Sequence, residues 1–381
     1  MRQGRGLSSR ITAAAIGAFL LFLLVFNLTL RFRRPADIEA GIAYAKARVI
    51  GIENDTVRPD PDFPDIRIGR QDLVLEITGG AHRGEIIRTY NLVERIINNP
   101  ARVGTRFIIS SYDNFLTALV VDYDREAVVY GLAALFAAAV VALGRRKGAR
   151  SLLALLFTLV CIFFFFIPLT VVGVDPILAA LAVVAVSTVV TLWMLNGWSA
   201  KTASAVVGCV TCTFLAGLVA FLFGALARVT TMNTPEAETL LFVSRGTHLS
   251  FRHLLFAGVL FSSLGAITDT AMSISSSIFE LRALNPKLPR TQLFRSGMNI
   301  GRDVMGTMTD TLILAFTGGS INTLVIFYMY ALPYMRLINM QLLVVEILRG
   351  LSSSIAVVVS IPVTALLAVL LCDRKKDINF P

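Results

Sequence analysis

Apolar stretches of about 20 residues recur along this chain, and each has the length that a helix needs to cross about 30 Å of hydrocarbon. Two further apolar stretches are each longer than one straight span can use. Only 16% of the 381 residues are charged, against about 25% in average globular proteins, which excludes a soluble globular fold. We expect an α-helical polytopic membrane protein with about eight transmembrane helices, one or two of them broken. The six regular stretches are 11–30, 127–143, 151–172, 177–195, 204–226 and 254–279, and the two longer ones are 304–334 and 342–372.

One polar block, residues 31–126, interrupts this pattern with 14 basic and 15 acidic residues. It contains five short runs rich in Val, Ile and Leu, separated by turn-forming segments. In one run Leu73, Leu75 and Ile77 alternate with more polar residues, as in a strand with one buried face. The block therefore predicts a small, all-β, OB-like closed barrel, because closure leaves no exposed edge strand. The five expected strands are 44–52, 72–77, 85–90, 106–110 and 117–121.

Basic loops predict the orientation. Clusters of Arg and Lys follow the second, fourth and sixth apolar stretches, and such clusters favour the cytoplasmic side. We therefore expect a cytoplasmic N-terminus with an uncleaved signal anchor at 1–30, and an extracytoplasmic β domain at 31–126. Membrane helices two to five (127–226), an extracytoplasmic loop (227–253) and helices six to eight (254–372) would follow, with loop 282–302 and the tail 373–381 in the cytoplasm.

The adjacent glycines Gly318 and Gly319 divide the stretch 304–334. One helix broken there gives eight spans and a cytoplasmic tail, whereas two separate spans give nine and place the basic tail outside. The positive-inside rule favours eight spans.

Three carboxylates, Asp269, Asp303 and Asp310, fall within or at the ends of apolar helices. A charge at the bilayer centre costs about 2.5–3.5 kcal/mol on insertion scales, so such residues usually serve a function. They recur with small and polar residues at spacings of three or four, which places them on helix faces. We predict a site for an inorganic cation or a proton. Its candidate residues are Asp269, Thr268, Thr270, Ser273, Asp303, Asp310, Thr309 and Thr311.

Packing offers an alternative explanation for the same stripes. Gly265, Gly301 and Gly306 would let helices approach closely, Gly318 and Gly319 would form a hinge, and Arg302 could pair with Asp303. Cys209 and Cys212 form a C-x-x-C inside an apolar helix, where we interpret them as packing residues because a redox or metal site needs a polar environment. We predict no metal site and no cofactor.

The run ELRALNPKLPRTQLFRSGMNIGRDVMGTMTDTLILAF, the preceding LGAITDTAMSI and the later SIPVTALLA resemble the YibE/F family of multi-pass bacterial membrane proteins. The motif-level likeness spans about 254–367, and the layout of anchor, outer β block and membrane helices is also similar. The resemblance implies a membrane protein without an established substrate or reaction. The family pattern often carries Asn where this chain has Asp310, which weakens the case for a charge there.

Three functions follow as hypotheses. The first is a secondary transporter or transport-system component. The second is a non-enzymatic scaffold or export-complex subunit whose β domain binds a membrane or cell-envelope protein. The third is an intramembrane hydrolase, which is weakly supported because no nucleophile and base pair can be assembled from the spacing. We expect no enzyme activity and no nucleic-acid partner, since the basic residues lie beside apolar spans.

Overall fold

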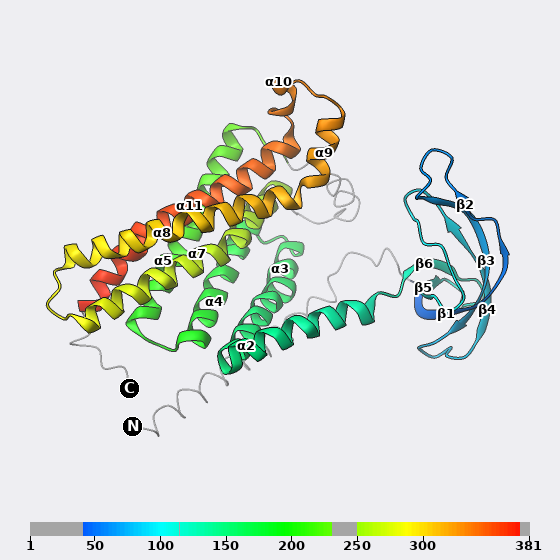
Figure 1. Ribbon diagram of the computed structural model, residues 1–381, viewed down its shortest axis with the longest axis horizontal. Coiled ribbons are helices and arrows are strands. Elements are labelled where there is room, and N and C mark those ends of the chain that lie inside the picture. The colour runs from blue at the N-terminus through cyan, green and yellow to red at the C-terminus, as the bar shows by residue number, and fades with distance from the viewer. Residues whose placement is uncertain (1–40, 114, 231–249, 374–381) are drawn as a thin grey trace. The chain divides into compact units, whose positions relative to one another are not determined.

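The computed structural model describes residues 41–113, 115–230 and 250–373. Two compact units make up the chain: Ala36–Ala142, and a helical unit whose described residues begin at Leu143 (Figure 1). The first unit therefore extends beyond the predicted limit at residue 126. The signal anchor predicted at 1–30, most of the loop 227–253 and nearly all of the tail 373–381 lie outside the described residues.

A curved antiparallel sheet forms the first unit. All five predicted strands are present with shifted ends, and a short sixth strand was not predicted. The hydrogen-bonded order is β2-β3-β1-β5-β6, with β4 also pairing with β3. Leu73, Leu75 and Ile77 are buried, as their alternation predicted. The strands are β1 (Ala43–Asp55), β2 (Arg58–Pro59), β3 (Arg67–Ile77), β4 (Ile86–Val93), β5 (Arg106–Ser111) and β6 (Leu119–Tyr123).

The prediction of a closed barrel was wrong, because the sheet curls only into a half-barrel. Closure would need a ladder between β4 and β6, and the described strands form none. The Thr89 hydroxyl donates instead to the backbone oxygen of Ala118, just before β6. β6 has only five residues, and a register shift between Ile108 and Ile109 disrupts its pairing with β5. Too little regular strand remains to join the two edges.

The helical unit matches the apolar stretches closely. By length and composition, five helices among the described residues could cross a membrane, or six if a bent pair counts as one. The first helix, α2 (Glu126–Cys161), begins in the first unit and ends in the helical unit. The elements that follow it are a π-helical turn η1 (Ile162–Phe166), α3 (Ile167–Val171), α4 (Pro176–Asn196), α5 (Ala200–Leu226), α7 (Phe251–Leu284), α8 (Arg290–Gly319), α9 (Ile321–Met329), α10 (Tyr334–Leu337) and α11 (Gln341–Asp373).

Two breaks divide the longest helical stretches. The 46 residues from Glu126 to Val171 would extend about 69 Å as one helix, but Arg145 has a non-helical backbone (φ 48°, ψ −128°). The predicted spans 127–143 and 151–172 lie on either side of it. The second break follows Gly319, where α8 and α9 bend by 61°, as the glycine pair predicted.

Small residues let the helices of the second unit pack closely. A side chain at Gly217 would meet Leu260 of α7, and one at Gly301 would meet Ile361 of α11. Polar contacts add to this packing, since the hydroxyls of Ser204 on α5 and Ser275 on α7 lie 2.6 Å apart. Helices α5, α7, α8 and α11 thus form one bundle (Figure 1).

The predicted basic loop 282–302 was wrong in extent, because α8 already begins at Arg290. Leu293, Gly297 and Gly301 are the buried residues of α8 and recur every four positions, so they form one packed face. Arg295 and Arg302 remain outside that face. A segment can therefore be basic and helical at once when its small residues all lie on one side.

Candidate functional site: the polar faces of α7 and α8

Asp269 lies on the open face of α7. Its side chain is exposed, as are those of Ser273 and Glu280 one and three turns further along, whereas Ile267 and Thr270 are buried in the bundle. Within this chain, the carboxylate therefore points away from the packed interior. It makes no hydrogen bond or ion pair with any residue in the described ranges.

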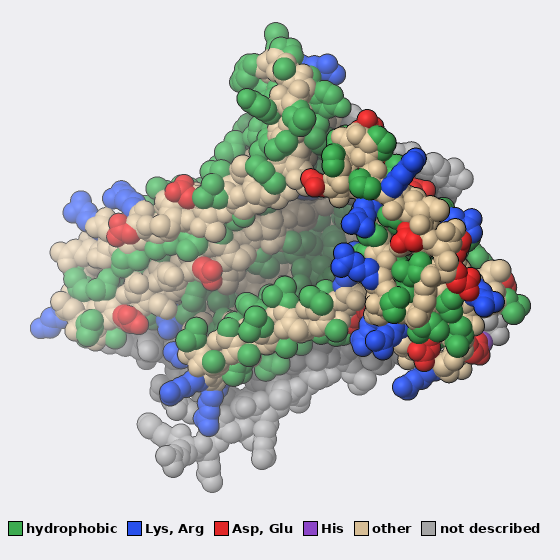
Figure 2. All heavy atoms as spheres, turned by 45° about the vertical axis from the view of Figure 1, so that its right-hand side comes forward, with side chains coloured by type: hydrophobic (Ala, Val, Ile, Leu, Met, Phe, Trp, Pro, Cys, Tyr) green, Lys and Arg blue, Asp and Glu red, His purple; other side chains and the backbone are tan. Residues whose placement is uncertain are grey.

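Asp303 and Asp310 are exposed on α8, on the side opposite its buried residues. Figure 2 shows acidic side chains along the helices of the second unit on the face that it presents. Arg302 donates to the Asn299 side chain at 3.3 Å, and no ion pair joins it to Asp303 among the described residues. The packing explanation proposed an ion pair between Arg302 and Asp303, and the described residues do not form it.

The predicted threonine ligands point elsewhere. Thr268 donates to the backbone oxygen of Leu264 and lies 3.1 Å from the Cys209 sulfur, inside the bundle. Thr270 is buried and donates to the backbone oxygen of Ala266.

On α8, the hydroxyls of Thr309 and Thr311 likewise donate to backbone oxygens of the preceding turn. Ser273 is exposed beside Asp269 on α7. The structure therefore brings Asp269 and Ser273 onto one helix face and directs the threonine hydroxyls to the backbone. Across the described ranges, no three His, Cys, Asp or Glu side chains form a metal-binding group.

The glycines divide into two kinds. Gly301 is packed against α11, as the packing alternative requires, whereas a Cβ at Gly265, Gly306, Gly318 or Gly319 would meet nothing within 4 Å. Gly265 lies one turn before Asp269, and Gly306 lies between Asp303 and Asp310. The face that carries the carboxylates thus contains small residues that contact no other helix in the described part of the chain.

A cavity of about 210 Å³ opens beside the break between α8 and α9. Phe316, Thr317 and Ser320 line it from the break, and Glu346 and Gly350 line it from α11. Glu346 accepts a hydrogen bond from Arg349 at 3.0 Å, so its charge is matched within the helix. Glu346 was not among the predicted site residues, although an acidic residue inside the apolar stretch 342–372 is a sequence signal for a functional site.

The two cysteines and one further polar pair lie elsewhere in the helical unit. Cys209 and Cys212 are buried in α5 as free thiols, packed among small residues of the bundle. An unpredicted pair joins Asp175 to His253 at 2.5 Å. Asp175 also caps α4 by accepting from the amide of Ile177 at 2.8 Å. Asp before Pro at a helix start is the sequence signal that could have revealed the cap.

Comparison with known proteins gives a family. A sequence model described as YibE/F-like protein matches residues 132–374, more than half of the chain and nearly all of its helical part. Strands β1–β6 precede the matched region. No curated protein and no solved structure matches the chain. The matched region contains every polar residue of α7 and α8 described above. Because the match covers more than half of the chain, the chain belongs to the YibE/F-like family.

Proposed function

We propose that this protein is a secondary transporter or a component of a transport system, in which carboxylates on α7 and α8 bind an inorganic cation or a proton. The observation that carries the proposal is that Asp269 in the apolar helix α7 is exposed and has no hydrogen-bond or ion-pair partner among the residues that the structure describes. An ionised carboxylate facing lipid would cost about 2.5–3.5 kcal/mol at the bilayer centre. A face that meets water or a bound cation removes that cost.

The polar residues extend over several turns of each helix, which supports an ion pathway more than a single binding site. Asp303, Gly306 and Asp310 extend along α8, and Gly265, Asp269 and Ser273 extend along α7. All six are small or acidic, so they leave room for water beside oxygen ligands. Oxygen ligands suit Na⁺, H⁺ or a hard divalent ion better than a soft metal.

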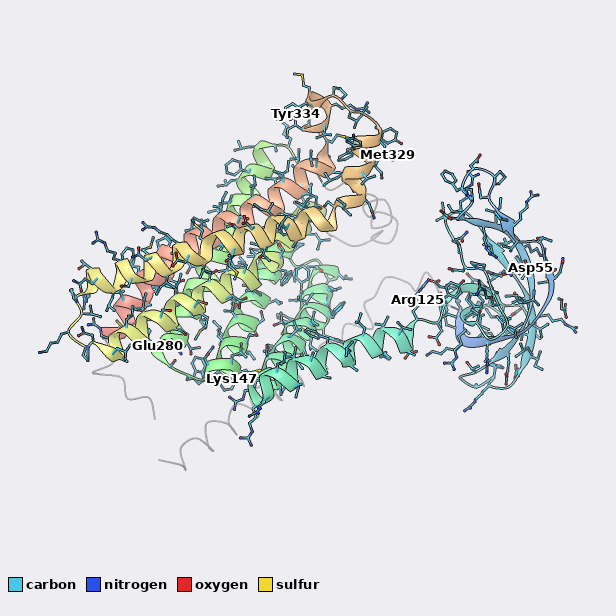
Figure 3. All side chains as sticks on the ribbon, in the orientation of Figure 1. Asp55, Arg125, Lys147, Glu280, Met329 and Tyr334 are labelled. Carbon is cyan, nitrogen blue, oxygen red and sulfur yellow. The ribbon has the colours of Figure 1, made fainter. Side chains whose placement is uncertain are left out.

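The helix order supports eight crossings in this proposal. Gly301 packs on Ile361 and Gly350 packs near Phe316, so α8 and α11 run antiparallel along most of their lengths. Each then crosses once, and residues 320–340 join them at one end. Exposed Tyr328, Tyr330 and Tyr334 at that end suit a membrane–water interface. Figure 3 labels Met329 and Tyr334 there and Glu280 at the opposite end of the unit.

The test measures the flux of Na⁺, H⁺ or a hard divalent ion into proteoliposomes that contain the purified full chain. Asp269→Asn keeps the size of the side chain and removes its charge, so we expect insertion to be preserved and flux to fall at least tenfold. Glu280→Gln is the matched control, because it removes an exposed carboxylate at the end of the same helix. We expect that control to transport normally. Asp310→Asn should have a milder effect than Asp269→Asn.

Equal flux in the wild type and Asp269→Asn would remove this carboxylate from the mechanism. Absence of flux in the wild type, together with thermal stability that responds identically to Na⁺, Mg²⁺, Ca²⁺ and pH in all variants, would favour the scaffold function instead. A partner protein that copurifies with this chain through the β domain would then identify the scaffold function.

A further inference from the structure

The β domain contains a polar pocket of about 420 Å³ at one end of the sheet. Asp55 of β1 lines it together with Arg67 and Gln71 of β3, and Ile52 and the segment Pro100–Val103 complete its lining. All of these residues belong to the first compact unit. The pocket has no part in the transport proposal and can be tested independently of it.

A buried amide fixes the shape of this pocket. Gln71 is only 2% exposed, and its side-chain nitrogen donates to Asp55 at 2.9 Å and to the backbone oxygen of Ala101 at 3.1 Å. Its side-chain oxygen accepts from the Ala101 amide at 2.7 Å. Gln71 therefore ties the 100–103 segment to the strands, so the pocket walls are held before any ligand arrives.

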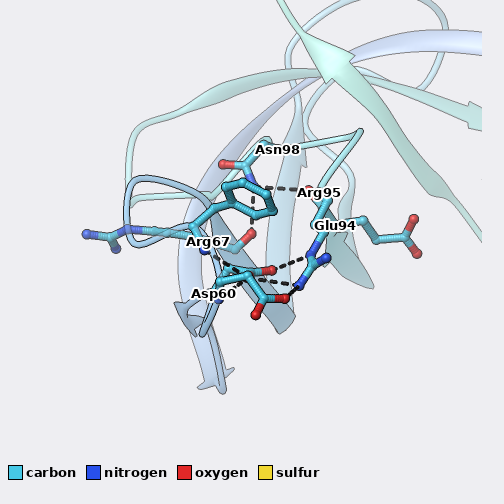
Figure 4. A network of polar contacts seen from close by, with 7 residues as sticks. Asp60, Arg67, Glu94, Arg95 and Asn98 are labelled. Atoms are coloured by element: carbon cyan, nitrogen blue, oxygen red, sulfur yellow. Dashed lines mark hydrogen bonds and ion pairs between the residues drawn. The ribbon is translucent and has the colours of Figure 1, made fainter. Parts of the chain in front are cut away.

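Several charged groups in this domain form ion pairs with one another. Arg88 pairs with Glu53 at 2.9 Å, and Arg95 donates to Asp60 at 2.5 Å. The Arg95 guanidinium holds the pKa of Asp60 below its usual range. Figure 4 shows the network around Asp60 and Arg95, with the Arg67 side chain extending away from it.

The pocket arginines differ from these. Arg67 and Arg102 are exposed, and neither makes an ion pair with a residue that the structure describes. The one carboxylate in the lining, Asp55, is engaged by Gln71 and by the Val57 amide at 2.9 Å. The lining thus contains two arginines and one aspartate whose oxygens already accept hydrogen bonds, which leaves the pocket with a net positive charge.

We propose that this pocket binds a phosphate-bearing anion. Guanidinium groups donate paired hydrogen bonds to phosphate and carboxylate oxygens. Phosphate suits the pocket better than a single carboxylate, because it carries enough oxygens for two separate guanidinium groups. The two sources of such a ligand are a free phosphate compound and the headgroup of a phospholipid.

Binding of radiolabelled inorganic phosphate to the purified full chain, measured by equilibrium dialysis at constant ionic strength, tests the proposal. Each of Arg67→Gln and Arg102→Gln should raise the Kd about tenfold or more, since each removes a charge-assisted hydrogen bond. Arg83→Gln is the matched control, because Arg83 is also exposed but lies outside the pocket lining. It should leave the Kd within about twofold of the wild type.

A second measurement needs no variant. Phenylglyoxal modifies free arginines, and saturating phosphate should slow modification of Arg67 and Arg102 but not of Arg83, as read by peptide mass spectrometry. Phosphatidic acid vesicles that displace labelled phosphate at a lipid phosphate concentration much below that of free phosphate would identify a lipid headgroup as the ligand. Absence of such displacement would identify a free anion. Lack of phosphate binding, or equal Kd values in all variants together with no protection, would overturn the proposal.

Discussion

At the residue scale, two glycines of α8 predict opposite responses to the same change. Gly301→Ala would place a methyl group against Ile361, whereas Gly306→Ala would meet nothing within 4 Å. Ala stabilises a helix interior by about 1 kcal/mol relative to Gly, but overpacking costs about 1–3 kcal/mol. The Ile361 side chain cannot easily move away, because a β-branched residue in a helix has one strongly preferred rotamer. We expect Gly301→Ala to lower the melting temperature in detergent.

Gly306→Ala should leave that melting temperature unchanged or raise it slightly. Equal destabilisation by both changes would mean that an unseen surface covers Gly306. That result would place a helix contact on the face to which we assign the carboxylates.

Residue spacing explains why the candidate site was only partly predictable. Spacings of three and four placed Asp269 and Ser273 together on α7, and both are exposed on one side. The same spacing cannot say which side of a helix meets its neighbours. The threonines were therefore expected beside the carboxylates, whereas a Thr hydroxyl in a helix can donate to the backbone oxygen four residues earlier, as Thr270 does.

At the scale of elements, the start of α4 depends on one side chain. Asp175 caps the helix and also pairs with His253 of α7. Loss of a cap alone usually costs about 1 kcal/mol of stability, and Asp175→Ala should cost more than that. Ser199→Ala, which removes the cap of α5, is the matched control. Thermal unfolding in detergent measures both.

Asp175→Asn should fall between the two, because it keeps an acceptor for the helix amides and loses the charge that faces His253. Equal melting temperatures for Asp175→Ala and Ser199→Ala would show that the His253 contact adds nothing to the cap.

At the scale of the whole molecule, the antiparallel order of α8 and α11 predicts which segments share a side of the membrane. A cysteine introduced at Tyr334 should react with an impermeant thiol reagent in intact cells, whereas one at Lys287 should react only after permeabilisation. The native cysteines, all buried, give little background. Reaction of a cysteine at Lys375 from outside would contradict eight spans and favour nine.

The sequence by itself determined the elements whose pattern is local. Helices α4, α5, α7 and α11 end within a few residues of the predicted apolar stretches, because hydrophobic length alone makes a segment suited to crossing a bilayer. The five strands followed from alternation and turn residues, and the break after Gly319 from a glycine pair.

Only the tertiary structure decided what depends on contacts between distant segments. It left the sheet a half-barrel, because closure depends on the match between β4 and β6. It extended α8 back to Arg290, because Gly297 and Gly301 find a partner surface. It also separated the packed glycines from the open ones and gathered Arg67 and Arg102 at one pocket. A sequence specifies which residues share a face, but the neighbour that the face meets is set by the fold.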